Sequence, residues 1–310
     1  MNGQDIACVT GASGMIGRQV VSQLLSKRYS VRVLTRRHQY NADGMNVFQG
    51  GLDDEEVVKA FLKGAHLLFH CAGELNDEMR MWDINVRGTE RLLRLASQQD
   101  FEYLCYLSSA GVVGKTRLLW VDEETPCDPQ NVYEKSKWAA EKVVAEGIEG
   151  CRVVILRPTN VIDEGNPGAF GFPMRNTWQD RLYIFLKGGE CSHIVHAEDV
   201  ASAALYFIDH PIESPQCFFV SCDHEPLNTF AGLWALYSAF LENHPLDSVH
   251  PVPHLPLIIP HTLRQLWRGG GNRGDVRYSA NKLMSAGFKF RLGVAGAARK
   301  LFSHHSQEVI

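Results

Sequence analysis

A glycine-rich turn near the start of the chain constrains its fold more than any other feature. The turn reads Gly11-Ala12-Ser13-Gly14-Met15-Ile16-Gly17, so three glycines are spaced three residues apart. An apolar run over residues 6–9 precedes it, and a helix-like apolar pattern over residues 20–25 follows. This order of strand, turn and helix predicts backbone N–H groups at a helix N-terminus, which attract a pyrophosphate. A plain strand-to-helix turn is the alternative, because glycine turns are common.

A second motif lies far downstream, where Tyr133 and Lys137 are four residues apart in an expected helix over residues 132–145. Residues at this spacing share one helix face. A lysine ammonium there can lower the pKa of the phenol, which can then exchange a proton with a substrate oxygen. Ser109 follows an apolar run over residues 103–107, at the carboxyl end of an expected strand. Ligands of open α/β sheets bind at such strand ends.

Apolar runs of strand length alternate with helical patterns through the first half, which predicts βαβ units and a parallel sheet. The expected strands are 6–10, 31–35, 46–49, 67–71, 103–108, 153–157 and 217–220. The expected helices are 14–26, 54–63, 81–99, 132–145 and 198–208. Residues 160–180 are rich in Gly, Pro and Asn and predict a long loop, and the chain turns mostly helical from residue 230.

Composition excludes several classes of protein. The chain has 310 residues and a net charge of -4, which gives no basic footprint for nucleic acid. No apolar run is long enough for a transmembrane helix, so no stable membrane insertion is expected. The first residues do not resemble a signal peptide, and we expect a cytoplasmic protein. The 8 cysteines are not in C-x-x-C spacing and the 13 histidines are scattered, so no metal site is predicted.

Seven short motifs together resemble the extended branch of the short-chain dehydrogenase/reductase superfamily, whose members are epimerase/dehydratase-like. The resemblance covers almost the whole chain. In chain order the motifs are Thr10–Gly17, His70-Cys71-Ala72-Gly73, Asn85-Val86-Arg87-Gly88-Thr89, Ser108-Ser109, Tyr133 with Lys137, Leu156-Arg157-Pro158, and the late Val-His-x-x-Asp-Val-Ala of residues 195–201.

The resemblance implies a Rossmann-type doubly wound α/β sheet with a smaller, mostly helical C-terminal substrate lobe. The cofactor domain would be residues 1–158, with 190–222 returning to the sheet, and the substrate lobe would be 159–189 and 223–310. The implied chemistry is hydride transfer at a secondary alcohol or ketone, with Ser109, Tyr133 and Lys137 catalytic. A nucleotide-sugar epimerase or 4-reductase is the alternative enzyme. A non-catalytic NADP-binding regulator is the alternative of another class. Family members often pair, so a homodimer is also implied.

The cofactor is expected to be NADP rather than NAD. The second strand is followed by Arg36 and Arg37 and not by the acidic residue that holds the ribose of NAD. Arginines there can neutralise a 2′-phosphate. Where the family has Gly-Asp-Leu after the third strand, this chain has Gly51 in place of the Asp, and Asp53 is expected to be only a helix cap. The resemblance assigns cofactor contacts to Thr10, Gly11, Ser13, Gly14, Met15, Ile16, Gly17, Arg36, Arg37, Leu52, Cys71, Ala72, Gly73, Leu107, Tyr133, Lys137 and Pro158.

The substrate is a small molecule whose class the sequence leaves open. Asn160 matches a family position that contacts a nucleotide-sugar diphosphate, and Arg273 is a candidate phosphate ligand. Sugar-nucleotide members usually carry an Arg where this chain has Ser192. The apolar segment 251–267 and the residues around 275–288 are similar to hydroxysteroid-dehydrogenase-like and dihydroflavonol-reductase-like members, which act on apolar alcohols and ketones. Asn85 and His70 are expected to fix geometry rather than contact substrate.

Overall fold

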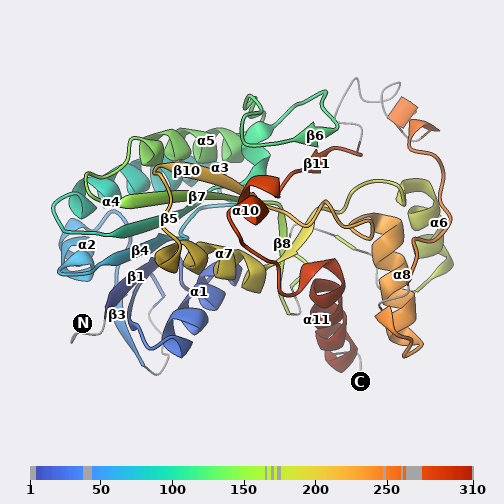
Figure 1. Ribbon diagram of the computed structural model, residues 1–310, viewed down its shortest axis with the longest axis horizontal. Coiled ribbons are helices and arrows are strands. Elements are labelled where there is room, and N and C mark those ends of the chain that lie inside the picture. Colours follow the sequence, from blue (N-terminus) through green and yellow to red (C-terminus); the bar gives the residue numbers. More distant parts are fainter. Residues whose placement is uncertain are drawn as a thin grey trace. The chain divides into compact units, whose positions relative to one another are not determined.

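A seven-stranded sheet with the order β10-β7-β5-β4-β1-β2-β3 is formed by strands between residues 6 and 220 (Figure 1). The computed structural model describes residues 5–37, 44–164, 166–168, 171–172, 176–246, 249–259, 261–262 and 274–308. The strands of this sheet are β1 (Ile6–Thr10), β2 (Ser30–Thr35), β3 (Met45–Gln49), β4 (Leu67–His70), β5 (Tyr103–Leu107), β7 (Arg152–Pro158) and β10 (Gln216–Val220).

The direction of winding changes at β1. Strand β1 pairs in parallel with β2 on one side and with β4 on the other. The chain then continues outward through β3 on the first side and through β5 and β7 on the second, again in parallel. Ligands of open α/β sheets bind at the carboxyl ends of the strands beside such a reversal. The fold therefore places a binding crevice next to the glycine turn that follows β1.

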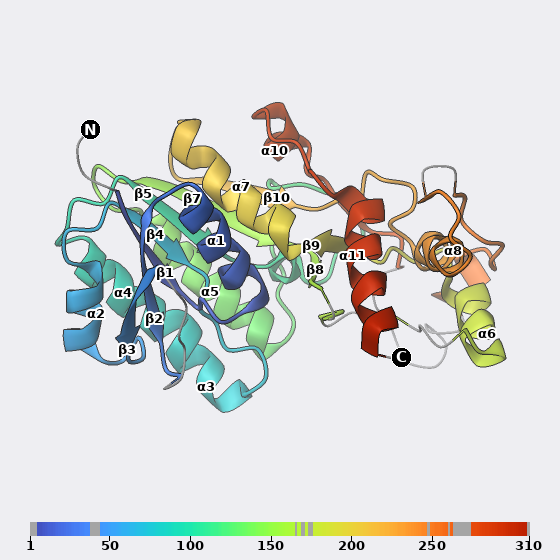
Figure 2. The same ribbon diagram turned by 90° about the horizontal axis from the view of Figure 1, so that it is seen from below.

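Helices cover both faces of the sheet (Figure 2). Helices α1 (Met15–Ser26) and α7 (Ala197–Asp209) lie on one face, where a hydrogen bond of 3.0 Å joins Gln23 to Ser202. The other face carries α2 (Glu55–Leu62), α4 (Gly88–Ala96) and α5 (Val132–Ala145). Buried side chains of these helices pack on the sheet, Phe61, Leu92 and Val144 among them.

The predicted parallel α/β sheet is confirmed, and most predicted elements agree with the structure to within two residues. The single helix expected over 81–99 is wrong, because α3 (Glu78–Trp82) is joined to α4 by a π-helical turn, Asp83–Arg87. The loop expected over 160–180 is also wrong in part. Its first residues form β8 (Asn160–Ile162) and its last ones begin α6 (Trp178–Lys187). Strand β8 exists because it pairs with the distant β9 (Ile194–His196), which local sequence does not reveal.

The chain divides into two compact units. The first comprises Met1–Gly114, Cys127–Arg157 and Val200–Phe218, and the second comprises Lys115–Pro126, Pro158–Asp199 and Phe219–Ile310. Buried aromatic rings of Phe172, Tyr237 and Phe302 contact one another in the second unit. Besides β8, β9 and α6, its elements include β6 (Trp120–Val121), α8 (Phe230–Leu241), β11 (Arg277–Tyr278), α10 (Asn281–Ser285) and α11 (Gly293–Glu308).

Candidate cofactor cavity and active site

The glycine turn is packed so closely that side chains are excluded from two of its positions. Gly11 has a φ of +68°, and a Cβ there would lie 2.6 Å from the backbone nitrogen of Ala72. A Cβ on Gly17 would lie 2.2 Å from the carbonyl oxygen of Gly11. The turn thus rests against the loop after β4, and α1 rests against the turn. This close packing leaves the first N–H groups of α1 available to an anion.

A cavity of about 390 Å³ opens at this point, at the carboxyl ends of the strands of the first unit. Every residue that the sequence assigned to the cofactor lines it, except Pro158. Pro158 ends β7 and belongs to the second unit. The lining comprises Thr10, Gly11, Ser13, Gly14, Met15, Ile16, Gly17, Leu34, Thr35, Arg36, Arg37, Gly50, Gly51, Leu52, Asp53, Cys71, Ala72, Gly73, Leu75, Arg80, Asp83, Ile84, Gly88, Arg91, Leu107, Ser108, Tyr133 and Lys137.

Behind the cavity wall, His70 is held by two threonines. Its Nδ1 lies 2.7 Å from the Thr10 hydroxyl, and its Nε2 lies 2.9 Å from the Thr89 hydroxyl. The Thr89 hydroxyl donates to the carbonyl of Asn85, and the Thr10 hydroxyl accepts from the backbone N–H of Ala72. The consistent arrangement has Thr10 donating to Nδ1 and Nε2–H donating to Thr89. Burial, and then the charge of Lys137, lower the pKa of His70 to about 3, so the ring is a neutral structural link.

Asn85 ties the loop after β4 to helix α5. Its side-chain oxygen accepts from the N–H of Glu74 at 2.7 Å, and its amide nitrogen donates to the Glu74 carbonyl at 3.1 Å. The same nitrogen donates to the Ser136 hydroxyl at 2.9 Å. Since Ser136 follows Tyr133 by three residues, Asn85 positions the first turn of α5. This geometry agrees with the structural role expected from the sequence.

Tyr133 stands on the first turn of α5, which begins with a capping box formed by Asn131 and Glu134. Burial raises the pKa of the Tyr133 phenol, and a hydrogen bond with the Ser109 hydroxyl acts in the opposite direction. The phenol pKa is therefore above its usual range in this structure, whereas the spacing of Tyr133 and Lys137 led us to expect a lowered one. The reason is desolvation, which disfavours the phenolate more than Ser109 stabilises it. Ser109 itself caps the 3-10 turn Ala110–Val113 by accepting from the N–H of Gly111 at 3.1 Å.

Lys137 is buried one turn further along α5. Its Nζ donates to the carbonyl of Leu107 at 2.5 Å and lies 4.4 Å from the ring centroid of Tyr106. Burial lowers the pKa of Lys137 to about 8, against the attraction of the Glu141 carboxylate. The sequence thus placed Ser109, Tyr133 and Lys137 in one neighbourhood of the first unit, but Tyr106 escaped notice.

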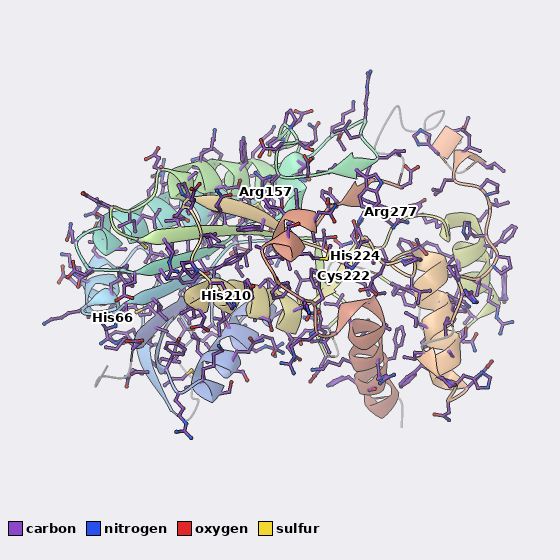
Figure 3. All side chains as sticks on the ribbon, in the orientation of Figure 1. His66, Arg157, His210, Cys222, His224 and Arg277 are labelled. Carbon is purple, nitrogen blue, oxygen red and sulfur yellow. The ribbon has the colours of Figure 1, made fainter. Side chains whose placement is uncertain are left out.

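A buried ion pair underlies the same helix. Arg157, labelled in Figure 3, donates to Glu141 through Nη2 at 2.5 Å and through Nε at 3.1 and 3.2 Å. Ser108 donates to the second oxygen of Glu141 at 2.5 Å. The first serine of the Ser108-Ser109 pair is therefore engaged with Glu141, which leaves Ser109 for the phenol. Sequence reasoning missed Glu141, although its spacing of four residues from Lys137 places both on one helix face.

The adenosine end of the cavity departs from the expectation for Asp53. Helix α2 is capped by Asp54, whose side chain accepts from the N–H of Val57, so Asp53 is not the cap. A Cβ placed on Gly51 would lie 2.1 Å from Oδ1 of Asp53 and 3.7 Å from Cδ of Arg36. The Asp53 carboxylate thus fills the space of the missing side chain at position 51. Arg36 and Arg37 are exposed on the cavity rim. The pKa of Glu74 is lowered chiefly by a hydrogen bond from the backbone N–H of Asn76, and the charge of Arg36 acts in the same direction.

Asn160 and Ser192 lie in the second unit, where they belong to one hydrogen-bond network. The Asn160 amide donates to the Ser192 carbonyl at 2.7 Å, and the Ser192 hydroxyl donates to Asn228 at 2.5 Å. Asn228 also donates to Asp223 at 3.1 Å, and Asp223 contacts Nδ1 of His193 at 2.7 Å. Arg273, the other substrate candidate, lies outside the described residues, as does the end of the apolar segment 251–267.

Asp223 also anchors the short strand β11. Its carbonyl accepts from Arg277 at 2.5 Å, and its carboxylate accepts from the N–H of Tyr278 at 2.8 Å. Figure 3 labels Arg277 in this part of the second unit.

Within the described ranges, no group of three His, Cys, Asp or Glu side chains is placed to hold a metal ion. Over the same ranges, no helix is long and apolar enough to span a bilayer.

Comparison with known proteins identifies the family. The sequence profile of the NAD dependent epimerase/dehydratase family matches residues 7–220. The chain belongs to this family. A crystal structure of a short-chain dehydrogenase/reductase superfamily protein from Agrobacterium tumefaciens with bound NAD shares the fold, with a TM-score of 0.75, 20% identity and coverage of 98% of both chains.

Curated relatives of this family member differ in their chemistry. Sterol demethylase protein B of Methylococcus capsulatus is 28% identical over 230 residues, which cover 70% of this chain and 69% of that protein. A putative UDP-glucose 4-epimerase of Methanocaldococcus jannaschii is 28% identical over 217 residues, covering 64% of this chain and 71% of that protein. An uncharacterised protein of Sinorhizobium fredii is 29% identical over 208 residues, which span 64% of this chain but only 52% of that protein.

Proposed function

We propose that the protein is an NADP-dependent oxidoreductase that transfers hydride to or from a secondary alcohol or ketone. One observation carries this proposal, which is that a single cavity of the first unit is lined by the glycine turn, Tyr133 and Lys137. The glycine turn would hold the pyrophosphate and Lys137 the nicotinamide ribose. The bound cofactor supplies the hydride chemistry.

In the proposed reduction, Tyr133 gives its phenolic proton to the substrate oxygen as hydride reaches the carbonyl carbon. The Ser109 hydroxyl, which is hydrogen-bonded with the phenol, orients that oxygen. The ammonium of Lys137 stabilises the phenolate that remains, since opposite charges favour each other in a buried site. The raised pKa of Tyr133 keeps the phenol protonated at neutral pH, which suits a proton donor.

The preference for NADP is part of the proposal. Arg36 and Arg37 line the cavity on the loop after β2, and they can pair with a 2′-phosphate. Asp53 fills the place of a side chain at position 51 and offers a carboxylate acceptor to the adenine amine. The second unit is the proposed substrate lobe, and homodimer formation is proposed with it from the family resemblance. Cytoplasmic residence is proposed as well.

An apolar substrate is favoured over a nucleotide sugar. The position that supplies an arginine in sugar-nucleotide members holds Ser192, which is fully buried and bonded to Asn228. The resemblance to a sterol demethylase protein points the same way. A nucleotide-sugar epimerase is the second candidate function, since the chain also resembles a putative UDP-glucose 4-epimerase. A regulator without catalysis is disfavoured because both Tyr133 and Lys137 are retained.

The test is consumption of NADPH with a panel of apolar ketones, measured for the wild type and for Tyr133→Phe. Loss of a general acid lowers turnover by about 10²- to 10⁴-fold. The affinity of the variant for NADPH, measured by fluorescence titration, serves as the control and is expected to stay within about twofold of wild type. Turnover by Tyr133→Phe at the wild-type rate would contradict the proposed proton transfer.

A further inference from the structure

Strand β5 carries two buried tyrosines on opposite faces of the sheet, and their hydroxyl groups differ. The Tyr103 hydroxyl donates to the carbonyl of Ala204 at 2.6 Å. The Tyr106 hydroxyl is buried and has no hydrogen-bond partner among the described residues. An unsatisfied buried hydroxyl costs about 1–3 kcal/mol. Among the described residues, the contacts of Tyr106 that involve polar groups are therefore made by its ring and not by its hydroxyl.

The ring of Tyr106 faces a cation. Nζ of Lys137 lies 4.4 Å from the ring centroid, well within the 6 Å range of a cation–π contact. The neutral His70 ring lies 5.4 Å from the same ring, so His70 does not compete as a cation for its face. The Leu107 carbonyl, which follows Tyr106 directly, accepts from Nζ. Two consecutive residues of β5 thus contact the ammonium, Tyr106 through its ring and Leu107 through its carbonyl. Lys137 also lines the cavity.

Few charges compensate this buried ammonium. Among the described residues, Glu141 is the carboxylate that attracts it, and Glu141 is itself shared with Arg157 and Ser108. Among the described residues, the other titratable groups recorded near the ammonium are the Cys71 thiol, the Tyr106 phenol and the His70 ring. Burial lowers the pKa of Lys137 to about 8, close enough to neutral pH for a modest stabilisation to change its charge.

We propose that Tyr106 is a positioning residue whose ring keeps the Lys137 ammonium charged and aimed into the cavity. The role of Lys137 in catalysis rests on the proposed function. The cation–π contact does not, because it can be tested by titrating Lys137 itself.

The experiment measures the rate at which acetic anhydride labels Lys137 as a function of pH, with the modified residue quantified by mass spectrometry. Tyr106→Phe keeps the ring and is expected to keep the wild-type midpoint. Tyr106→Leu and Tyr106→Met remove the ring, and the midpoint is expected to fall by about 0.5 to 1 pH unit, the equivalent of a cation–π contact. Two apolar replacements guard against the misfolding of either, and circular dichroism reports whether each variant folds.

Tyr103→Leu is the matched control, since it removes a buried ring from the same strand on the face away from Lys137. Its labelling midpoint is expected to equal that of the wild type. Equal midpoints for Tyr106→Phe and both apolar variants would overturn the proposal, as would an equal shift in Tyr103→Leu. A purely structural role of Tyr106 would lower stability without moving the midpoint.

Activity then separates this proposal from the proposed function. In an active enzyme, kcat of Tyr106→Leu is expected to decline on the alkaline side of its pH profile at a lower pH than kcat of the wild type. Tyr106→Phe is expected to decline at the wild-type pH. If the wild type reduces no ketone while the labelling midpoints shift as expected, the proposed function fails and the role of Tyr106 stands. If turnover is present and the midpoints do not move, the proposed function stands and the role of Tyr106 fails.

Discussion

The cavity of the first unit and the polar network of the second use polar side chains in opposite ways. Around the cavity, exposed arginines and the ends of Tyr133 and Lys137 line an open space. In the second unit, the buried side chains of Ser192 and Asn228 satisfy each other at 2.5 Å, and Asn228 extends the network to Asp223. The first arrangement is suited to a ligand. The second has already used its hydrogen-bonding capacity within the protein.

This contrast shows that a residue which matches a family motif does not always have the role of the family's residue. Asn160 matches a substrate-contacting position of the family, yet its amide donates to the Ser192 carbonyl. A substrate oxygen would have to compete with that bond. By contrast, Arg36 matches no motif letter but lies on the cavity rim. Sequence position alone does not distinguish the two situations, because the difference lies in which partner the fold brings nearby.

The largest effect expected at neutral pH lies in the polar network and concerns stability. Asn228 is fully buried, accepts from Ser192 and the N–H of Ile194, and donates to Ile194 and Asp223. Asn228→Ala is expected to lower the free energy of unfolding by about 3 kcal/mol, because several buried polar groups lose their partners. Urea unfolding measures this loss. NADPH affinity of the folded variant is expected to match the wild type, and Gln179→Ala, at an exposed position of α6, is the control. A weakened affinity for NADPH would contradict the separate roles of the polar network and the cofactor cavity.

The next effect lies at the cavity rim and concerns the cofactor. Arg36→Ala is expected to weaken NADPH binding by about 30-fold and NADH binding by less than twofold, since only NADPH carries the 2′-phosphate. Fluorescence titration with both cofactors gives the two ratios. Arg80→Ala removes another arginine of the same cavity and is expected to affect both cofactors equally. An equal loss for Arg36→Ala would remove the assignment of the 2′-phosphate.

A pH effect sharpens the comparison within the cavity wall. Because burial lowers the pKa of His70 to about 3, the unfolded state binds a proton below pH 6.5 that the folded state does not. Stability from His70 is therefore complete above pH 6.5 and is lost as the pH falls towards 3, by at most about 1.4 kcal/mol per pH unit. Acid unfolding of wild type and His70→Gln, followed by circular dichroism, is expected to show a shallower decline in the variant. Parallel declines would contradict the buried neutral ring.

The smallest expected effect concerns the adenine end. Asp53→Ala is expected to weaken NADPH and NADH equally, by about fivefold, because one carboxylate acceptor is lost. The double variant Gly51→Asp with Asp53→Gly is expected to restore binding, since it returns the carboxylate to position 51. Asp54→Ala, which removes the cap of α2, is the control and is expected to lower stability with little effect on affinity. A failure of the double variant to restore binding would show that Asp53 has another role.

The sequence predicted the sheet well because its information is local. The glycine turn and the apolar runs of β1, β4 and β5 are each contained in a few residues. The π-helical turn was missed because the apolar pattern runs through it without interruption. Strand β8 was missed because only its distant partner β9 makes it a strand.

The candidate site divides in the same way. The residues around the glycine turn and on the first turns of α5 follow from spacing. The contact of Tyr106 with Lys137 and the ion pair of Glu141 with Arg157 join separate elements. Such contacts depend on tertiary packing and on the desolvation that accompanies it. The wrong direction expected for the pKa of Tyr133 has the same origin.

Calorimetric titration of the NADPH-saturated protein with UDP, dTDP, GDP, CDP and ADP tests the preference for an apolar substrate most directly. We expect no binding of any of them, because Ser192 and Asn228 are engaged with each other and Asn160 is engaged with the Ser192 carbonyl. Micromolar binding of one nucleotide would contradict the preference for an apolar substrate and would identify the nucleotide-sugar epimerase as the correct function.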